Sequence, residues 1–508
     1  MNKFRIILLF SLFLYLQCGV NAQKADLTTQ FLNNQAIIYA INIRNFAAID
    51  KNGDGIIDLS KGDIRGTFVN AKDKLPMLKK EGINTLYLLP ITKTGKLKAL
   101  GSAGSLYALD SFVELNSQLD DITDSRTIKE QAKDFIKYAH SLDFNVIADM
   151  PSCGSYDLSL NKPSWFIKNE DNEAPIPADW TDVRLFKVYN KDGTLYEQTL
   201  KNFKSFIDMI IDLGFDGVRA DVAAIKPYEF WKELIDYSKT KNENFVFIAE
   251  ASPDWQNPAP NWVKHYATIN ELAKAGFIGY YGSWSDFKNV KTKKQFDLKI
   301  EKNLKILKQN KNLALLGAFA THDQQAPILK GKNYWNMVLW LNITLPVNSY
   351  FLDGFSTGDD FIYPYENKKV NVTYTDDEYY FVHNGMFDIF NLSAATRNKH
   401  PEFKEEYIRA IKFKDDYKDL IKPFNYKTLN TGNDSVFAYK LTNSKYTLLV
   451  IGSLNDRKRA TTRIKLKELN KDNVEIINSK IKPKLTKSKL TTSLEPMEMQ
   501  VYLINKSL

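Results

Sequence analysis

The chain has 508 residues, 44% of them hydrophobic, and a formal net charge of +9 at pH 7. Its length suits about three domain equivalents, or one large barrel with a smaller domain. Lysines spread along the chain carry the charge, and no helix-turn-helix, zinc-ligand or aromatic-basic pattern accompanies them, so we expect a solvated surface and no nucleic-acid partner.

The N-terminus predicts export. Two basic residues precede an apolar run at residues 6–16, and small residues at 20–22 offer a cleavage site before Gln23. This is the layout of a secretory signal peptide over residues 1–22, and its apolar run is too short to span a membrane. We therefore expect a periplasmic or secreted protein with no transmembrane segment.

The two cysteines bear on membrane anchoring and on disulfide bonding. Cys18 follows the apolar run, so a lipid anchor on Cys18 is the alternative to a free exported chain. After removal of the leader only Cys153 is left, which excludes an intrachain disulfide. The fold must then be held by its core, and by a metal ion if the chain binds one.

Short apolar runs separated by amphipathic stretches recur over most of the chain. This alternation is typical of a parallel sheet covered by helices. The runs are AIIYAINI, INTLYLLP, FNVIADMP, FDGVRADV, NFVFIAEA and LALLGAFATHD, which begin at residues 36, 83, 144, 215, 244 and 313.

The spacing of these runs favours an α/β fold built as a (β/α)8 TIM barrel over residues 23–400. A barrel averages about 31 residues per strand–helix unit, and the fourth and fifth runs are one such unit apart. The gap after the third run is too long for one unit, and its Pro, Asn and Asp content predicts an inserted subdomain at 152–185. Beyond residue 400, short partly alternating runs predict an antiparallel β-sandwich domain at 401–508.

Four carboxylates come at the ends of the predicted strands, where a barrel carries its catalytic face. A single acid there could be a helix N-cap, but four in this register are harder to explain that way. Converging acids repel one another, so such a site needs different protonation states, as glycoside cleavage does. The four are Asp149, Asp221, Glu250 and Asp323.

Arg219 is two residues before Asp221, so both side chains point to the same side of the strand. A guanidinium in that position would keep Asp221 ionised, as a nucleophile must be.

These strand-end motifs resemble those of glycoside hydrolase family 13, the α-amylase family. The segments GFDGVRADV, VFIAEASP, FATHDQQ and GSLYALDSF are similar to family motifs, in the same order, and the resemblance covers most of the mature chain. It implies a retaining α-glycosidase acting on α-glucans or maltooligosaccharides, by hydrolysis or transglycosylation.

The resemblance also implies roles for individual residues. Asp221 would be the nucleophile that forms the covalent glycosyl intermediate, Glu250 the acid/base, and Asp323 a sugar-binding carboxylate. Arg219 would orient Asp221, and Asp149 would belong to the substrate site. His322 would bind sugar hydroxyls and Tyr107 would stack on the sugar; the alternatives are a buried structural histidine and an ordinary core tyrosine.

The chain departs from the family pattern after the third strand. Cys153 and Gly154 stand where the family usually has Asn-His, which puts affinity for the sugar at the cleavage point in doubt. A catalytically impaired glucan-binding protein on the same scaffold is therefore the alternative function. Linkage specificity, the choice between hydrolysis and transfer, and the oligomeric state are left open.

The segment DKNGDGIID, residues 50–58, places oxygen donors at alternating positions. In an EF-hand the twelfth position is a bidentate glutamate, and here it is Lys61, which excludes that motif. Many family members carry a similar calcium loop after the first barrel strand, so the resemblance implies a structural Ca²⁺. A solvated turn without metal is the alternative. The implied ligands are Asp50, Asn52, Asp54, the carbonyl of Ile56, and Asp58.

Overall fold

The structure is a computed structural model, which describes residues 26–177, 181–255, 267–360, 389–390, 392 and 400–506. The predicted signal peptide and Cys18 lie outside these ranges. Within them, no helix combines the length and apolar character that crossing a membrane requires.

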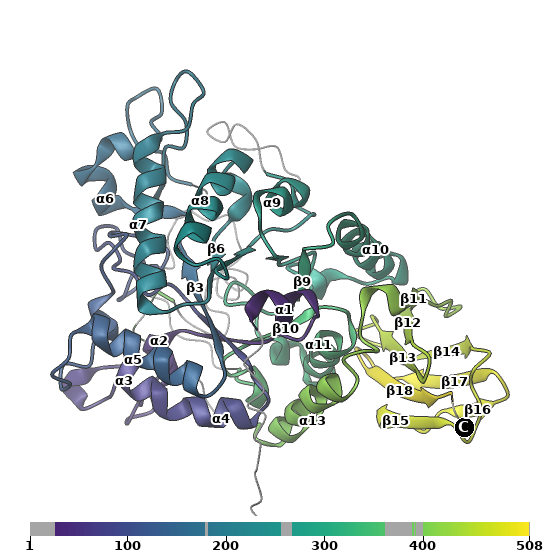
Figure 1. The fold of residues 1–508 in the computed structure, drawn as a ribbon. Coiled ribbons are helices and arrows are strands. Elements are labelled where there is room, and N and C mark those ends of the chain that lie inside the picture. The colour runs from purple at the N-terminus through teal and green to yellow at the C-terminus, as the bar shows by residue number, and fades with distance from the viewer. Residues whose placement is uncertain are drawn as a thin grey trace, which may run out of the picture.

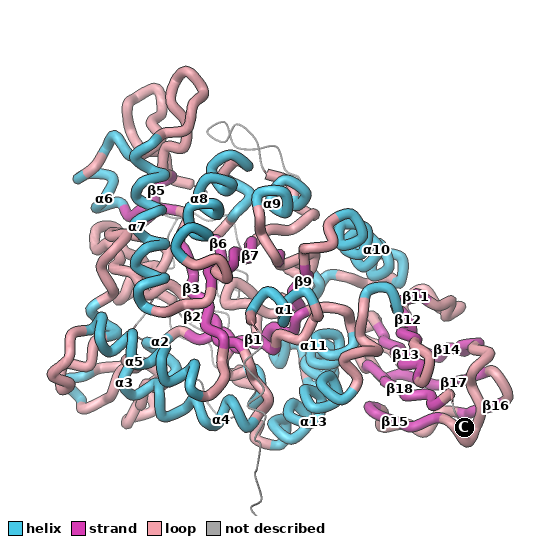
Figure 2. The backbone as a smooth tube through the Cα atoms, viewed as in Figure 1, coloured by secondary structure: helices cyan, strands magenta, loops and turns pink. Residues whose placement is uncertain are grey.

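Eight parallel strands close into a barrel, and helices surround it (Figures 1 and 2). The strands are almost wholly buried because helices cover the outside and side chains fill the interior, which explains their apolar sequences. In order around the barrel they are β1 (Ile37–Ile41), β10 (Asn348–Leu352), β9 (Ala314–Gly317), β8 (Gly279–Tyr280), β7 (Val246–Ala249), β6 (Gly217–Ala220), β3 (Asn145–Met150) and β2 (Thr85–Leu88).

Several helices begin at a side-chain cap, as in α5, where Thr127 and Glu130 form a capping box. The α-helices are α1 (Leu27–Leu32), α2 (Ile43–Phe46), α3 (Phe68–Ala71), α4 (Leu75–Lys80), α5 (Ile128–Ser141), α6 (Tyr156–Asn161), α7 (Glu197–Leu213), α8 (Tyr228–Lys241), α9 (Ile269–Ala275), α10 (Lys293–Gln309), α11 (Lys332–Thr344) and α13 (Glu402–Asp416). Short 3-10 helices are η1 (Leu59–Lys61), η2 (Lys72–Lys74), η3 (Ser117–Leu119), η4 (Pro163–Trp165), η5 (Ala223–Ile225), η6 (Phe287–Asn289), η7 (Pro327–Lys330), η8 (Phe355–Thr357) and η9 (Pro423–Asn425).

Gly217 lets the strand that carries Arg219 and Asp221 approach its neighbour closely. A Cβ at Gly217 would lie 2.7 Å from the carbonyl oxygen of Val246 on β7. Any side chain there would push β6 away from β7, and with it the residues at the end of β6.

The predicted barrel is confirmed. Two of its strands are not among the six predicted runs: β8, which has only two residues, and β10, which begins with the polar pair Asn348 and Ser349. Between β3 and β6 the chain leaves the barrel and forms an antiparallel pair of strands, β4 (Cys153–Ser155) and β5 (Val183–Leu185), together with α6. This is the region predicted as an insertion.

The predicted antiparallel domain at the C-terminus is also confirmed. One sheet has the order β11-β12-β13-β18-β15 and a second has the order β14-β17-β16, with an apolar cluster formed by side chains from both. The strands are β11 (Tyr426–Thr428), β12 (Val436–Thr442), β13 (Tyr446–Ser453), β14 (Ala460–Lys465), β15 (Val474–Asn478), β16 (Lys484–Thr486), β17 (Lys489–Leu494) and β18 (Met499–Asn505).

Helix α13 follows the predicted domain boundary at residue 400, yet it packs on α11 of the barrel. Its apolar side buries Phe403 and Tyr407, among others, in the barrel cluster. The sandwich docks on the same side of the barrel, where Phe296 of α10 stacks on Phe437 of β12 with ring centroids 4.0 Å apart.

Candidate active site

The predicted polar side chains of the central strands meet at the carboxyl-terminal end of the barrel. Asp149 on β3 is the register partner of Arg219 on β6, so the parallel pairing itself sets these two side by side. Asp221 follows β6 and Glu250 follows β7, and both are buried. The structure therefore brings together four residues that the sequence predicted to share one site.

Arg219 joins three carboxylates. Its Nη1 lies 2.8 Å from Asp149 Oδ1 and 3.0 Å from Asp221 Oδ1, and its Nη2 lies 2.9 Å from Glu250 Oε2. The guanidinium is 2% exposed, so water screens these contacts very little. The planar fork of arginine can hold several acids at once, which the single ammonium of a lysine cannot do as well.

Asp221 receives a second donor from the segment after β3. The Ser152 N–H donates to Asp221 Oδ2 at 3.1 Å, and the Ser152 hydroxyl donates to the Asp221 carbonyl. Burial raises the pKa of Asp221, and the Arg219 guanidinium opposes that rise. The predicted contact between Arg219 and Asp221 is present, but the net pKa change is upward because desolvation outweighs the guanidinium.

Glu250 has a carboxyl pKa far above its usual range. Burial is the main cause, the charges of Asp221 and Asp323 add to it, and Arg219 opposes it; the pKa is raised to about 8. The Val222 N–H donates to Glu250 Oε2 at 2.7 Å. Val222 presents this N–H from a left-handed backbone with φ 38°, which is strained for a β-branched residue.

Tyr107 and His322 form one stacked unit beside these acids. Their rings lie 5.5 Å apart at an angle of 8°, and the Tyr107 hydroxyl is 2.7 Å from His322 Nε2. The same hydroxyl donates to Asp149 Oδ2 at 2.6 Å. The His322 side chain is 1% exposed and its Nδ1 has no hydrogen-bond partner, which leaves a buried polar atom able to receive a further group.

Asp323 differs from the other acids because its side chain is 48% exposed. Its Oδ1 lies 3.4 Å from His322 Nε2. Asp323 thus stands at the open side of the cluster, in a position to meet an incoming molecule.

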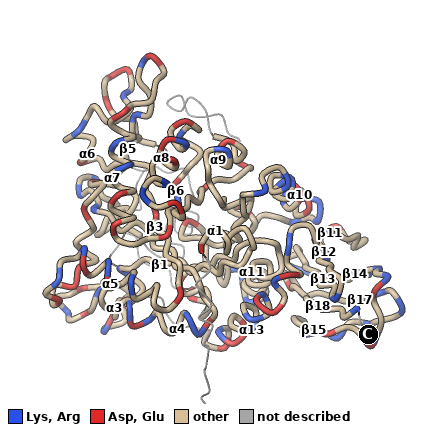
Figure 3. The backbone as a smooth tube through the Cα atoms, in the orientation of Figure 1, with Lys and Arg blue, Asp and Glu red and all other residues tan. Residues whose placement is uncertain are grey.

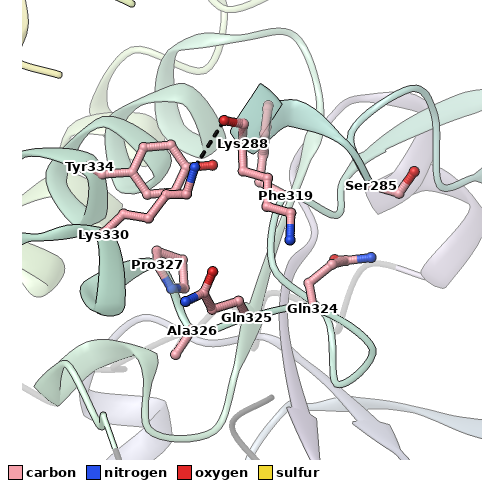
Figure 4. A pocket seen from close by; sticks show the side chains of 9 residues that line it. All are labelled: Ser285, Lys288, Phe319, Gln324, Gln325, Ala326, Pro327, Lys330 and Tyr334. Atoms are coloured by element: carbon pink, nitrogen blue, oxygen red, sulfur yellow. Dashed lines mark hydrogen bonds between the residues drawn. The ribbon is translucent and has the colours of Figure 1, made fainter. Parts of the chain in front are cut away.

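A small pocket of mixed polar and apolar lining lies between the loops that follow β8 and β9 (Figure 4). Gln324 and Gln325, the neighbours of Asp323 in the chain, line it together with Lys288 and Lys330. The Lys330 ammonium donates to the carbonyl of Lys288 at 3.0 Å. The pocket thus includes the two residues that follow the exposed carboxylate in the chain.

Sequence reasoning missed several residues of the site. The Tyr87 hydroxyl on β2 donates to Asp149, and the Tyr281 ring after β8 lies 5.4 Å from the Arg219 guanidinium. Ser152 was also missed, although it contacts Asp221. The only sequence signal for Tyr87 and Tyr281 is a tyrosine within an otherwise apolar segment. An apolar run does not show which of its aromatic rings contacts a polar group.

Lys226 is a further missed residue, buried behind Ser152. Its Nζ donates to the Ser152 carbonyl at 3.0 Å, and burial lowers its pKa to about 8 while the acidic groups of Cys153 and Asp221 oppose that fall. Burial raises the pKa of the Cys153 thiol to about 12, so it stays a thiol near neutral pH. The structure thus assigns no reactive role to Cys153.

The predicted calcium ligands make contacts within their own segment of the chain. Asp50 accepts from the N–H groups of Gly53 and Gly55, both at 2.7 Å, so its carboxylate turns to its own loop. The Lys61 ammonium lies 3.7 Å from Asp54 and 3.5 Å from Asp58. Over the described residues, no group of three or more His, Cys, Asp or Glu side chains is placed to hold a metal ion.

Known structures share this architecture. An α-amylase from Lactobacillus plantarum matches with a TM-score of 0.64 over 94% of this chain and 99% of that one, at 18% identity. The chain has the α-amylase fold. A maltogenic α-amylase from Thermotoga neapolitana matches with a TM-score of 0.63 over 93% and 99%, at 17% identity. No protein-family model matches the chain.

Curated relatives with sequence similarity carry related names. An alpha-1,4-glucan:maltose-1-phosphate maltosyltransferase of Bifidobacterium animalis subsp. lactis is 28% identical over 201 residues, 37% of this chain and 27% of the relative. An α-amylase of Haloarcula japonica is 24% identical over 229 residues, 43% and 30%. The matched part thus spans about a third of the length of such relatives. The predicted resemblance to the α-amylase family is confirmed.

Proposed function

We propose that this protein is an exported retaining α-glycosidase that acts on α-glucans or maltooligosaccharides, by hydrolysis or by transfer. The observation that carries the proposal is the Arg219 guanidinium shared by Asp149, Asp221 and Glu250. It brings a candidate nucleophile and a candidate acid to one buried point, which double displacement requires. Relatives named as amylases and as a glucan maltosyltransferase support both outcomes of the reaction.

In the proposed mechanism the Asp221 carboxylate attacks the anomeric carbon and forms a glycosyl ester. Glu250 is protonated at neutral pH because its pKa is about 8, so it can donate that proton to the departing sugar oxygen. The Glu250 carboxylate then takes a proton from water or from a hydroxyl group of a second sugar. The oxygen of that acceptor attacks the anomeric carbon, and the bond between this carbon and the Asp221 carboxylate breaks. Arg219 holds both carboxyl groups in place throughout.

The substrate residues have separate tasks in this proposal. Tyr107, held by its stack on His322, offers a flat surface to the sugar ring, and His322 would bind sugar hydroxyls. Exposed Asp323 would bind sugar hydroxyls and meet the substrate first. Asp149 accepts hydrogen bonds from Arg219 and from the Tyr107 hydroxyl, so it holds these two side chains in position.

The test is product analysis with purified protein on maltooligosaccharides and on α-1,4, α-1,6 and α-1,1 substrates. We expect new reducing ends or longer transfer products of retained configuration. Glucan binding without turnover on the whole panel would reject catalysis and favour the impaired binding protein. The replacement of the usual Asn-His by Cys153 and Gly154 is the feature that motivates that alternative.

Replacing Lys226 with Met should shift the acidic limb of the kcat/KM profile to higher pH, by on the order of one unit. Loss of a buried cation that interacts with Asp221 raises the pKa of that nucleophile, so it is protonated over a wider acidic range. Arg at the same position keeps the charge and is the matched control. A uniform fall in kcat/KM at every pH would contradict this effect and indicate only a disturbed fold.

Calcium at residues 50–58 is a separate proposal, supported by the alternating oxygen donors of the sequence and tested by melting. If the loop rearranges to bind Ca²⁺, chelator lowers the melting temperature by a few degrees, and Asp54→Ala removes that sensitivity because it deletes one ligand. Asp73→Ala, outside the loop, is the control. Melting that ignores both calcium and chelator would leave Lys61 as the partner of Asp54 and Asp58.

A further inference from the structure

The small sheet β14-β17-β16 has one apolar face and one strongly basic face. Ile464, Leu490 and Leu494 point into the sandwich core. By strand register, the opposite face carries alternate residues of all three strands. These are Thr461, Arg463, Lys465, Lys484, Thr486, Lys489, Thr491 and Ser493, called here the basic face.

The basic face holds four cations and no acid. Arg463, Lys465, Lys484 and Lys489 are all exposed. Lys465 and Lys489 are direct cross-strand partners, an arrangement of like charges that destabilises a sheet. Over the described residues none of the four takes part in an ion pair, whereas Lys440 on the other sheet pairs with Glu468. The cations thus carry an electrostatic cost with no internal partner.

A groove of about 500 Å³ lies at the β14 end of this face, between β14 and residues 429–432. Arg463 and Lys465 line it together with Thr461, Thr462 and Thr491, and residues 429–432 complete the lining. Pockets of about 300–1,000 Å³ hold small molecules or a short stretch of a polymer. The face lies on the side of the sandwich away from the barrel (Figure 1), so it is separate from the candidate active site.

The chemistry of the lining restricts the ligand. Hydroxyl groups and cations suit a molecule with both hydroxyls and oxyanions, and arginine binds oxyanions through two parallel hydrogen bonds. The basic face has no aromatic ring on which a nucleic-acid base could stack, and no apolar side chain that would enter a membrane. Lysines and arginines occur on both domains (Figure 3). The two that line this groove, Arg463 and Lys465, belong to the basic face, which carries no acid.

We propose that the basic face of the C-terminal sandwich is a second binding site, which holds an acidic polysaccharide along the groove at Arg463 and Lys465. Its chemical class is a glycan bearing sulfate, phosphate or carboxylate groups. Such a site would keep the catalytic barrel close to a charged glycan without taking part in catalysis.

The experiment measures binding of the whole protein to dextran sulfate, with neutral dextran of the same length beside it. We expect binding to dextran sulfate that weakens as salt screens the charges, and much weaker binding to neutral dextran. Arg463→Gln with Lys465→Gln should weaken it at least 10-fold. Lys427→Gln with Lys445→Gln removes the same charge from exposed positions outside the face and should leave binding unchanged.

Several results would overturn the proposal. Equal losses in both double variants would mean that only net charge matters. Equal binding of the two dextrans would remove the role of charge, and tighter capture of single-stranded DNA or of anionic lipid vesicles by the same two residues would replace the glycan by those partners. Lysines on edge strands also prevent aggregation, so a face variant that aggregates yet binds normally would assign that role instead. Because binding is the readout, the result does not depend on the proposed catalysis.

Discussion

Glu250→Gln should lower kcat by about 10²- to 10⁴-fold on natural glucans, the usual contribution of a general acid. The amide has nearly the shape of the carboxyl but no proton to donate. Its contact with the Val222 N–H can persist, so the loss is chemical rather than structural. A nitrophenyl glycoside, whose leaving group needs no proton, should lose much less in the first step. Steady-state and single-turnover rates on both substrates measure the difference.

The pH profile gives a second result for the same variant. An acid must be protonated to act, so activity of the parent should fall as pH rises through about 8, the pKa of Glu250. In Glu250→Gln this alkaline limb should be absent from the residual activity. Turnover and an alkaline limb that both survive the substitution would remove Glu250 from the acid role.

Glu250→Gln should raise the stability of the folded protein at high pH although it lowers activity. The folded pKa of Glu250 is raised from 4.5 to about 8, so the folded protein holds a proton that the unfolded chain releases. Stability from this group is fully present below pH 4.5 and is lost as pH rises to about 8. Glu250→Gln removes the loss, and we expect it to melt higher than the parent above pH 8 and near the parent below pH 4.5. Identical melting at all pH values would mean that Glu250 is not desolvated.

The barrel was predictable because most of its longer strands lie in apolar runs, as burial on both faces demands. β8 was not, since two residues, Gly279–Tyr280, carry no periodicity. Helix α13 shows a different limit. Its amphipathic sequence says that it packs on something, but only the structure shows that the partner is the barrel and not the sandwich.

The charged part of the candidate site was largely predictable, because parallel strands bring their carboxyl ends to one rim. Its environment was not. The sequence shows Arg219 beside Asp221 and so suggests a lowered pKa, whereas burial, which depends on the whole fold, raises it. Ser152 and Lys226 were missed for a related reason: their contacts with each other and with Asp221 arise from loops whose path no local pattern describes.

Arg219→Met should destabilise the protein by roughly 3–5 kcal/mol at pH 8, the usual cost of leaving a buried charge without its partner. Methionine fills much of the volume, but Asp149, Asp221 and Glu250 lose the group that joins them. Denaturant unfolding at fixed temperature measures this loss. Activity should disappear with it, because the two carboxyl groups of the proposed reaction are no longer held.

The stability lost in Arg219→Met should depend on pH, because the acids left without the guanidinium are ionised only at higher pH. Without the guanidinium the pKa values of Asp221 and Glu250 rise further above those of the unfolded chain, so the variant loses stability as pH increases and recovers part of it at pH 5. Arg219→Lys keeps one charge and should lie between variant and parent. Adding Asp149→Asn to Arg219→Met should restore part of the stability, since it removes one unpaired acid. An equal loss of stability at pH 5 and pH 8 would mean that Arg219 stabilises the fold through packing. Its charge would then not be what holds the three carboxylates together.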